Sequence, residues 1–207
     1  MQRTGATRVL AGLVIAVALT GALSTPSSGE PRPSDPGEMQ IEELPGYESS
    51  EEARLPLPDQ RQVVFFRTTE PSGTLIIDTP NRFLYLVLGN SHALRYGISV
   101  GRDCLHWQGF ARISRKMEWP DWTSPPEVSA HHPEFPKFVT GGAGNPLGAR
   151  VIEIDDNGYR IQGTNQPQII GHAVSSGCFR LVNTDVIHLF QRVRVGTRVV
   201  VRQAPEM

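Results

Sequence analysis

The sequence predicts a mainly β domain, a β sandwich of mixed sheets with one short helix. Short runs rich in β-branched and aromatic residues recur from residue 63 onward, and Gly, Pro and Asn turn signals separate them. Only residues 183–193 combine possible capping residues with apolar positions at helical spacing. About 145 residues follow residue 62, which is enough for one domain with its own hydrophobic core.

Seven short runs are predicted to be strands, at residues 63–67, 74–78, 82–88, 93–100, 151–154, 159–161 and 198–201. Turn signals join the first four, which predicts an antiparallel meander. The segment Asp156-Asn157-Gly158 joins the fifth and sixth runs and is a strong hairpin signal. The predicted helix lies before the last run and begins near Asn183-Thr184-Asp185.

The N-terminal 62 residues are expected to lie outside the domain. Residues 1–24 have a positive start at Arg3 and Arg8, an apolar stretch and small residues near position 24, which predicts a signal peptide. The apolar stretch is short for a membrane span of about 20 residues, although an uncleaved anchor is an alternative. Residues 25–62 are rich in Pro and acidic residues, which predicts a disordered or extended linker. The chain is therefore expected to be exported to the periplasm.

Charge limits the choice of partners. The residues after position 62 include 15 basic and 12 acidic side chains, a net charge of +3. Such a mild excess suits an anionic matrix but does not support nucleic-acid binding. The adjacent residues His131 and His132 face different ways, and no Cys/His spacing indicates zinc, so we expect neither a metal site nor a cofactor.

Residues 118–148 form a long excursion rich in Trp, Pro and Gly. A loop of this length inside a compact domain is often a lid or a binding wall. An ordered surface loop with tryptophan anchors is an equal alternative. The glycines at 141–144 do not form a phosphate loop, because no lysine or helix pattern follows them.

Cys178 carries the strongest chemical signal in the chain. Small residues precede it and Arg180 follows it, which favours an exposed thiol beside a cation. A thiolate is a strong nucleophile, and a nearby guanidinium stabilises it. The alternative is that Cys178 is a small buried apolar residue, as free cysteines usually are.

The motifs around Cys178 resemble those of the YkuD-type L,D-transpeptidase family. They are Ile161-Gln-Gly-Thr-Asn165, Ser175-Ser-Gly-Cys-Phe-Arg-Leu-Val-Asn183 and Val195-Gly-Thr197, with Trp119-Pro-Asp-Trp122 and Gly144-Asn-Pro-Leu-Gly148 upstream. The resemblance covers residues from about 70 to 202. It implies a YkuD-like β sandwich as the fold of the domain 63–203.

The resemblance also implies an activity on peptidoglycan. Such enzymes attack tetrapeptide stems between diaminopimelate and the terminal D-alanine and form a cysteine thioacyl-enzyme, which passes the acyl group to an amine or to water. The amine belongs to another stem, which gives a crosslink, or to an outer-membrane protein. Their cysteine is also acylated by carbapenems, and the resemblance implies no cofactor.

Roles are implied residue by residue. Cys178 matches the nucleophile, and the backbone amides of Gly177 and Cys178 lie where an oxyanion would be held. The resemblance places the other oxyanion or substrate-binding positions at Gly163, Ser175, Ser176 and Arg180. An ordinary structural ion pair is an equal alternative for Arg180.

One position departs from the family pattern. The usual catalytic histidine is replaced by Gln162, whose amide cannot take a proton near neutral pH. His172, six residues before Cys178, is a possible substitute base. Alternatively, the thiol ionises through Arg180 and nearby amides with reduced activity, or the domain binds peptidoglycan without turnover.

Cys104 is the second cysteine of the chain. Two cysteines of an exported protein can pair, and a bond to Cys178 would block the nucleophile. The sequence does not show whether the two Cα atoms approach within about 7 Å. We expect Cys104 to be an unpaired loop or core residue.

Overall fold

The computed structural model describes residues 55–131, 133–155, 158–175 and 177–203. The chain divides into two compact units, residues 1–38 and 39–207, and the first lies wholly outside the described residues. The predicted signal peptide at 1–24 and most of the predicted linker also lie outside them. No helix within the described ranges is long and apolar enough to cross a membrane.

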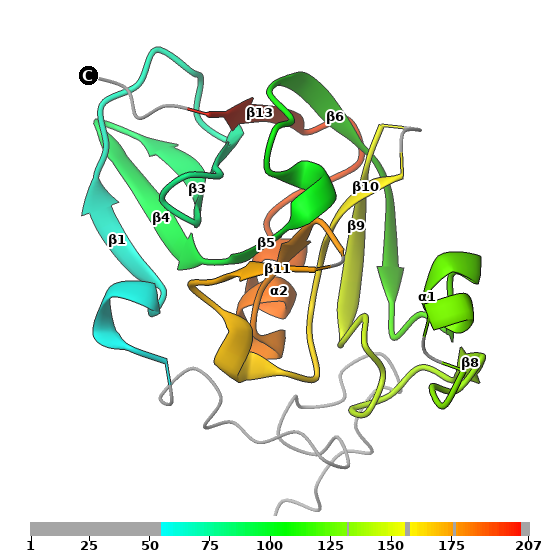
Figure 1. The fold of residues 1–207 in the computed structure, drawn as a ribbon. Coiled ribbons are helices and arrows are strands. Elements are labelled where there is room, and N and C mark those ends of the chain that lie inside the picture. The colour runs from blue at the N-terminus through cyan, green and yellow to red at the C-terminus, as the bar shows by residue number, and fades with distance from the viewer. Residues whose placement is uncertain (1–54, 132, 156–157, 176, 204–207) are drawn as a thin grey trace, which may run out of the picture. The chain divides into compact units, whose positions relative to one another are not determined.

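Strands dominate the described part of the chain (Figure 1). They are β1 (Gln62–Phe65), β2 (Leu75–Asp78), β3 (Phe83–Gly89), β4 (His92–Gly97), β5 (Ser99–Gly101), β6 (Gly109–Glu118), β7 (Trp122–Thr123), β8 (Phe138–Val139), β9 (Arg150–Ile154), β10 (Tyr159–Gln162), β11 (Ala173–Val174), β12 (Phe179–Arg180) and β13 (Arg198–Arg202). The helices are α1 (Pro126–His131) and α2 (Asn183–Phe190), with 3-10 turns η3 (Leu57–Asp59), η4 (Arg102–Cys104) and η5 (Pro167–Ile169). The mainly β class and the short helix after the cysteine motif are confirmed.

The main sheet has the order β1-β4-β3-β2-β13-β6-β9-β10-β12-β5-β11. Its pairing is mixed, because β13 runs parallel to β2 and β12 runs parallel to β10. The long strand β6 joins the two halves: its first residues pair with β13, and its residues from Ile113 onward pair with β9. A register shift between Ile113 and Arg115 marks this transition, as expected for a bulge that bends a strand.

The predicted meander is partly wrong. Strands β2, β3 and β4 pair antiparallel in order, but β1 pairs with β4 and not with β2. The predicted strand 93–100 is also divided in two. Its second part, β5, pairs with β12 and β11 in the other half of the sheet. Both differences arise from contacts between segments far apart in the chain, which local propensity does not reveal.

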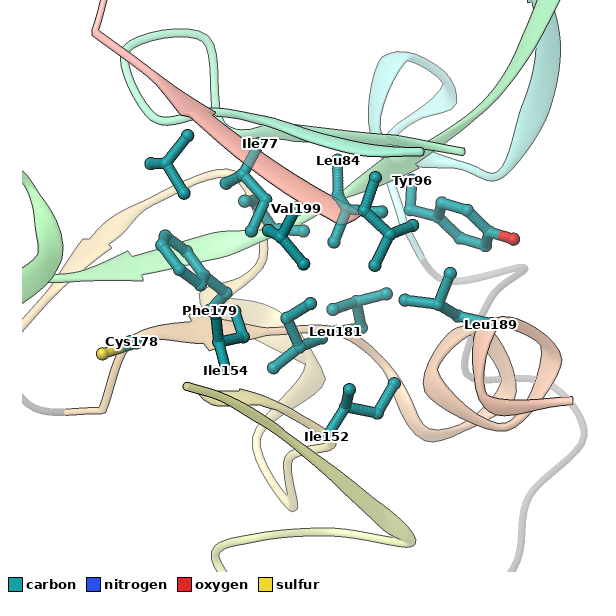
Figure 2. Packing of buried hydrophobic residues seen from close by; sticks show 14 of the residues in the cluster. Ile77, Leu84, Tyr96, Ile152, Ile154, Cys178, Phe179, Leu181, Leu189 and Val199 are labelled. Carbon is teal, nitrogen blue, oxygen red and sulfur yellow. The ribbon is translucent and has the colours of Figure 1, made fainter. Parts of the chain in front are cut away.

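Apolar side chains from both halves of the sheet form the main core. Figure 2 shows Ile77, Leu84 and Val199 facing Ile152 and Leu181, with Leu189 of α2 beside them. All six of these side chains are almost fully buried. This burial of facing aliphatic groups is the main stabilising term of a sandwich core.

The predicted linker boundary at residue 62 is corrected to lie further upstream. Leu55 is 6% exposed and packs with Ile170 and Val182. Arg61 forms an ion pair of 2.8 Å with the buried carboxylate of Asp185. Residues 55–62 therefore belong to the folded domain, because they cover apolar surface and neutralise a buried charge.

Helix α2 carries a half-buried histidine, His188. Its Nδ1 lies 2.9 Å from the hydroxyl of the buried Tyr96. Burial, followed by the positive charges of Arg61 and Arg192, lowers the pKa of His188 to about 4. The neutral imidazole is therefore the form that the fold stabilises.

This pKa predicts a loss of stability in mild acid. The unfolded chain takes up a proton on His188 near its ordinary pKa of 6.5, whereas the folded chain does so only near 4. The contribution of His188 is therefore fully present above pH 6.5 and is lost as the pH falls toward 4. Urea unfolding across this range should show a smaller loss in His188→Gln than in wild type. An equal loss in both proteins would contradict the assignment.

Candidate functional site

A cavity of about 610 Å³ lies between the 118–148 excursion and the strands that carry the cysteine motif. The excursion supplies its apolar wall, through Trp122, Pro125, Val128, Phe135, Pro136, Val139 and Leu147. The opposite wall is mostly polar and includes Arg160, Gln162, Asn165, Gln166, Ser175, Gly177 and Arg180. The excursion therefore forms a wall of the cavity, in agreement with the binding-wall alternative.

The excursion is held in place by Asn145, which sequence reasoning did not identify. Its side-chain nitrogen donates to the carbonyl oxygens of Pro120, Val139 and Thr140 at 3.0–3.1 Å. Its side-chain oxygen accepts from the amide of Leu147 at 2.8 Å. The strands β7 and β8 pair antiparallel within the same segment, and α1 lies beside β8 in Figure 1. One buried amide thus shapes the apolar wall, because its two N–H groups are shared among three carbonyl oxygens and its oxygen accepts from a fourth backbone group.

Gln162, the residue predicted to replace a catalytic histidine, lies at the end of β10. It is 2% exposed, and its Nε2 donates to the carbonyl of Pro146 at 3.2 Å. Its Oε1 accepts from Nε of Arg160 at 2.8 Å. The carboxamide is therefore bonded at both ends, and neither end can act as a general base.

Arg180 lies opposite Gln162 in the parallel pairing of β10 and β12, and both side chains line the cavity. Burial, and then the nearby charge of Arg160, lower the pKa of the Arg180 guanidinium. Burial likewise lowers the pKa of Arg160, which the carboxylate of Glu153 partly offsets. Two cationic groups thus share one partly desolvated wall.

Two features of the structure favour a glycine at position 177: its backbone conformation and the closeness of the Arg180 side chain. Its φ of 73° is in the left-handed region. A Cβ atom at this position would lie 2.9 Å from Nε of Arg180 and 3.1 Å from Nη2. The glycine therefore lets the arginine lie against the main chain just before Cys178.

A matched pair of alanine variants separates these two effects. Gly73 has a φ of 87° and no atom within 4 Å of an added Cβ. Gly177→Ala and Gly73→Ala should each lose about 1–2 kcal/mol of unfolding free energy from left-handed strain. Only Gly177→Ala should shift the Nε–Hε NMR resonance of Arg180. An unchanged resonance would contradict the predicted contact.

The expectation that Cys104 is unpaired is wrong, because Cys104 and Cys178 form a disulfide with a Cα–Cα distance of 5.3 Å. The cause is the unpredicted pairing of β5 with β12, in which the amide of Gly101 donates to the carbonyl of Cys178 at 2.7 Å. Turn η4 follows β5 at once and brings Cys104 beside Cys178. Cys104 is fully buried and Cys178 is 8% exposed, so both lie in the core. Neither is among the residues that line the cavity.

His172 does not lie with Gln162. It is exposed and lines a second cavity, of about 480 Å³, together with Asp59, Arg82 and Gln168. The cavity beside the cysteine motif is lined by neither His172 nor any other histidine of the described residues. The structure therefore gives no support to His172 as the substitute base.

The remaining predicted positions divide between the cavity and its support. Ser175 lines the cavity, whereas Ser176 lies outside the described residues. Gly163 is buried against Asn183, whose Oδ1 an added Cβ would strike, and it is not among the lining residues. Within the described ranges, no group of three or more His, Cys, Asp or Glu side chains could hold a metal ion.

Asn183 is a motif residue with a structural task. Its Oδ1 accepts from the amide of Ala149 at 2.8 Å, and its Nδ2 donates to the carbonyl of Thr164 at 3.0 Å. It does not cap α2, for which the N-cap is Val182 without a side-chain bond. The glycines Gly148 and Gly163 leave room for this amide. The asparagine thus ties both neighbouring loops to the start of α2.

Comparisons with known proteins agree with this geometry. The family profile described as the YkuD L,D-transpeptidase catalytic domain matches residues 72–201. A Fuscovulum blasticum protein from the ATP synthase subunits region is 37% identical over 60% of this chain and 67% of its own length. The Bacillus subtilis protein YqjB is 34% identical over 61% of this chain and 69% of its own length. Both are provisionally named L,D-transpeptidases.

A solved structure supports the fold alone. The structure described as the Ldtfm–avibactam carbamoyl enzyme has a TM-score of 0.50 and 19% sequence identity, and the match covers 66% of this chain and 51% of that chain. The β sandwich seen here is therefore shared at low sequence identity.

Proposed function

Because the chain belongs to the L,D-transpeptidase catalytic-domain family, we propose that it is a peptidoglycan L,D-transpeptidase with Cys178 as its nucleophile. The supporting observation is the cavity itself. Ser175, Gly177 and Arg180, which flank Cys178 in sequence, all line it. Cys178 itself does not line the cavity while it is bonded to Cys104, so the proposed reaction requires the reduced thiol to turn toward a carbonyl held there beside Arg180.

The proposed reaction has two steps. The Cys178 sulfur bonds to the carbonyl carbon of diaminopimelate, the C–N bond to D-alanine breaks, and the thiol proton leaves with the D-alanine amine. The amides of Gly177 and Cys178 would hold the oxyanion during this step. An acceptor amine or water then attacks the thioester, and its proton returns to the sulfur.

The two walls of the cavity suit a stem peptide. The apolar wall of Trp122 and Phe135 can cover the aliphatic chain of diaminopimelate. Arg160 and Arg180 on the other wall can face the carboxylates that every stem peptide carries. Acceptors of the acyl group would be a second stem or an amine of an outer-membrane protein.

The same proposal includes export. Residues 1–24 have the features of a signal peptide, and the Pro-rich acidic composition of the stretch that follows is typical of a linker. The substrate is extracytoplasmic, so the enzyme would work in the periplasm.

Two observations favour a second candidate, a domain that binds peptidoglycan without turnover. Gln162 cannot serve as a general base, and Cys178 is bonded to Cys104. A domain of this kind would retain the cavity and lose the reaction. Binding would then survive removal of the sulfur atom.

Intact-mass measurement after carbapenem treatment tests the first candidate against the second. The reduced full chain should gain one carbapenem mass, and Cys178→Ala should gain none. A reduced protein with two free thiols and no adduct would overturn the enzyme proposal. If Cys178→Ala then still pelleted with peptidoglycan, the binding candidate would be supported.

A further inference from the structure

The polar wall of the cavity contains two arginine side chains. Its charged lining residues are Arg160 and Arg180, and no carboxylate of the described residues lines it. Glu153 lies opposite Arg160 in the β9–β10 register, but it does not line the cavity. Among the described lining residues, a ligand in this cavity therefore meets two guanidinium groups and no carboxylate.

Gln162 determines how Arg160 is presented. The two residues lie two positions apart on β10, so their side chains project from the same face of the strand. The bond from Nε of Arg160 to Oε1 of Gln162 uses one of five N–H donors. The other four N–H groups of the Arg160 guanidinium take no part in that bond. Gln162 is itself held by the bond from its Nε2 to the carbonyl of Pro146.

Arg180 approaches from the neighbouring strand. It lies opposite Gln162 in the register, so Arg160 and Arg180 stand on adjacent strands of one wall. An anion between the two guanidinium groups would reduce the free-energy cost of burying their positive charges. Burial and the neighbouring charge of Arg160 lower the pKa of Arg180, so the charged form of Arg180 is the one that such an anion would stabilise. The planar fork of arginine matches the two oxygens of a carboxylate.

We infer that Arg160 and Arg180 together bind a carboxylate group of the peptide that occupies the cavity, and that Gln162 is the positioning residue for Arg160. The residue in place of the usual histidine thus serves ligand binding. The identity of the peptide as a peptidoglycan stem rests on the proposed function, whereas the carboxylate receptor does not require any reaction.

Calorimetric binding to the oxidised full chain tests this inference. The probes are the tetrapeptide L-Ala-γ-D-Glu-diaminopimelate-D-Ala and the same peptide amidated at its carboxylates. Wild type should prefer the acid over the amide by about tenfold to a hundredfold, the range of hydrogen bonds to a charged group. Arg160→Gln should remove most of this preference, and Arg194→Gln, an exposed arginine outside the cavity, should retain it.

Gln162→Leu tests the positioning role. It should reduce the preference for the acid in wild type but have no further effect in the Arg160→Gln background. If Gln162 had only a structural role, Gln162→Leu would instead weaken the binding of both the acid and the amide peptide, in wild type and in the Arg160→Gln background. Equal binding of acid and amide by wild type, or no binding of either, would overturn the receptor. A retained preference without carbapenem acylation would overturn only the proposed reaction.

The Cys104–Cys178 disulfide is a separate feature of the same site. It joins positions 74 residues apart, and its Cα–Cα distance of 5.3 Å is within the usual range of about 4.4–6.8 Å. The bond holds the Cys178 sulfur toward buried Cys104, while Gly177 and Arg180 on either side face the cavity. A sulfur in a disulfide carries no thiolate for acylation.

The geometry points to a redox latch on the nucleophile, which again rests on the proposed function. A dithiol reductant attacks the Cys178 sulfur, since Cys104 is fully buried, and the Cys104 thiolate leaves and takes a proton. The second thiol of the reductant then releases the Cys178 thiol and forms the reductant's own disulfide. Two electrons and two protons thus pass from the reductant to the cysteine pair.

Carbapenem acylation of the full chain in dithiothreitol buffers of graded reducing strength tests the latch. Wild-type adduct should rise in parallel with the loss of the disulfide, scored by iodoacetamide labelling of the thiols. Cys104→Ser should be acylated without reductant. Adduct formation in oxidised wild type, or labelling of both thiols before reduction, would overturn the latch. If wild type is fully reduced and neither wild type nor Cys104→Ser is acylated, the proposed reaction is overturned. Iodoacetamide labelling of the thiols would then still show whether the reductant opens the disulfide.

Discussion

Replacing Gln162 with histidine is expected to raise the acylation rate of the reduced protein by about 10²–10⁴-fold. The amide of Gln162 cannot accept the thiol proton, whereas a neutral imidazole can do so near physiological pH. Residue 162 lies at the end of β10, directly beside the strand that begins after Cys178. The rate of carbapenem adduct formation, followed by mass spectrometry in reductant, measures the effect.

The pH profile identifies the cause of that gain. Gln162→His should acquire a rise in rate near neutral pH, whereas wild type should follow only the ionisation of its thiol. Gln162→Asn, which adds no titratable group, is the matched control and should show no gain. His172→Gln should leave the wild-type rate unchanged, since His172 lines a different cavity. Equal rates in wild type and Gln162→His would show that another group already acts as the base.

The histidine variant should also lose ligand discrimination. Arg160 is held by the Oε1 acceptor of Gln162, and an imidazole places its acceptor differently. The acylation rate and the preference for an acidic peptide should therefore change in opposite directions.

The fold could be predicted where local signals determine the structure. The runs at β2, β3, β9, β10 and β13 alternate or concentrate β-forming residues, and all five are strands. Strand β6 was not predicted, because charged residues such as Arg112, Arg115 and Lys116 interrupt its apolar pattern. It forms because both of its halves find partners in distant strands. Pairing between distant segments is the part that local propensity does not contain.

The candidate site likewise contains residues that the local sequence predicted and residues whose positions depend on distant strand pairing. The motif predicted Cys178 and Arg180 as site residues; Arg180 lines the cavity, whereas Cys178 does not. Cys104 could not be assigned, because its position depends on β5 crossing to β12. Arg160 could have been found from its place two residues before Gln162 on a predicted strand, since such side chains share a face.

Asn183, the last residue of the cysteine motif, has a structural role in the packing of two loops. The Asn183 side chain bonds one amide and one carbonyl of two loops, and it is 4% exposed. Glycine at 148 and 163 removes the Cβ atoms that would strike its oxygen. Pro146 precedes the first of these positions and Gln162 ends the strand before the second, so the geometry of the cavity wall depends on a residue outside it.

Asn183→Leu is therefore expected to lower the free energy of unfolding by about 2–6 kcal/mol. Leucine has a similar size but leaves the amide of Ala149 and the carbonyl of Thr164 buried without their partner, at about 1–3 kcal/mol each. Urea unfolding measures the loss. Asn165→Leu is the matched control, because its side chain also bonds a backbone carbonyl, that of Gly144, but does so in an exposed position. It should change stability by about 0.5 kcal/mol or less. Similar losses in the two variants would show that Asn183 does not hold the loops, and the link between this motif residue and the cavity would fail.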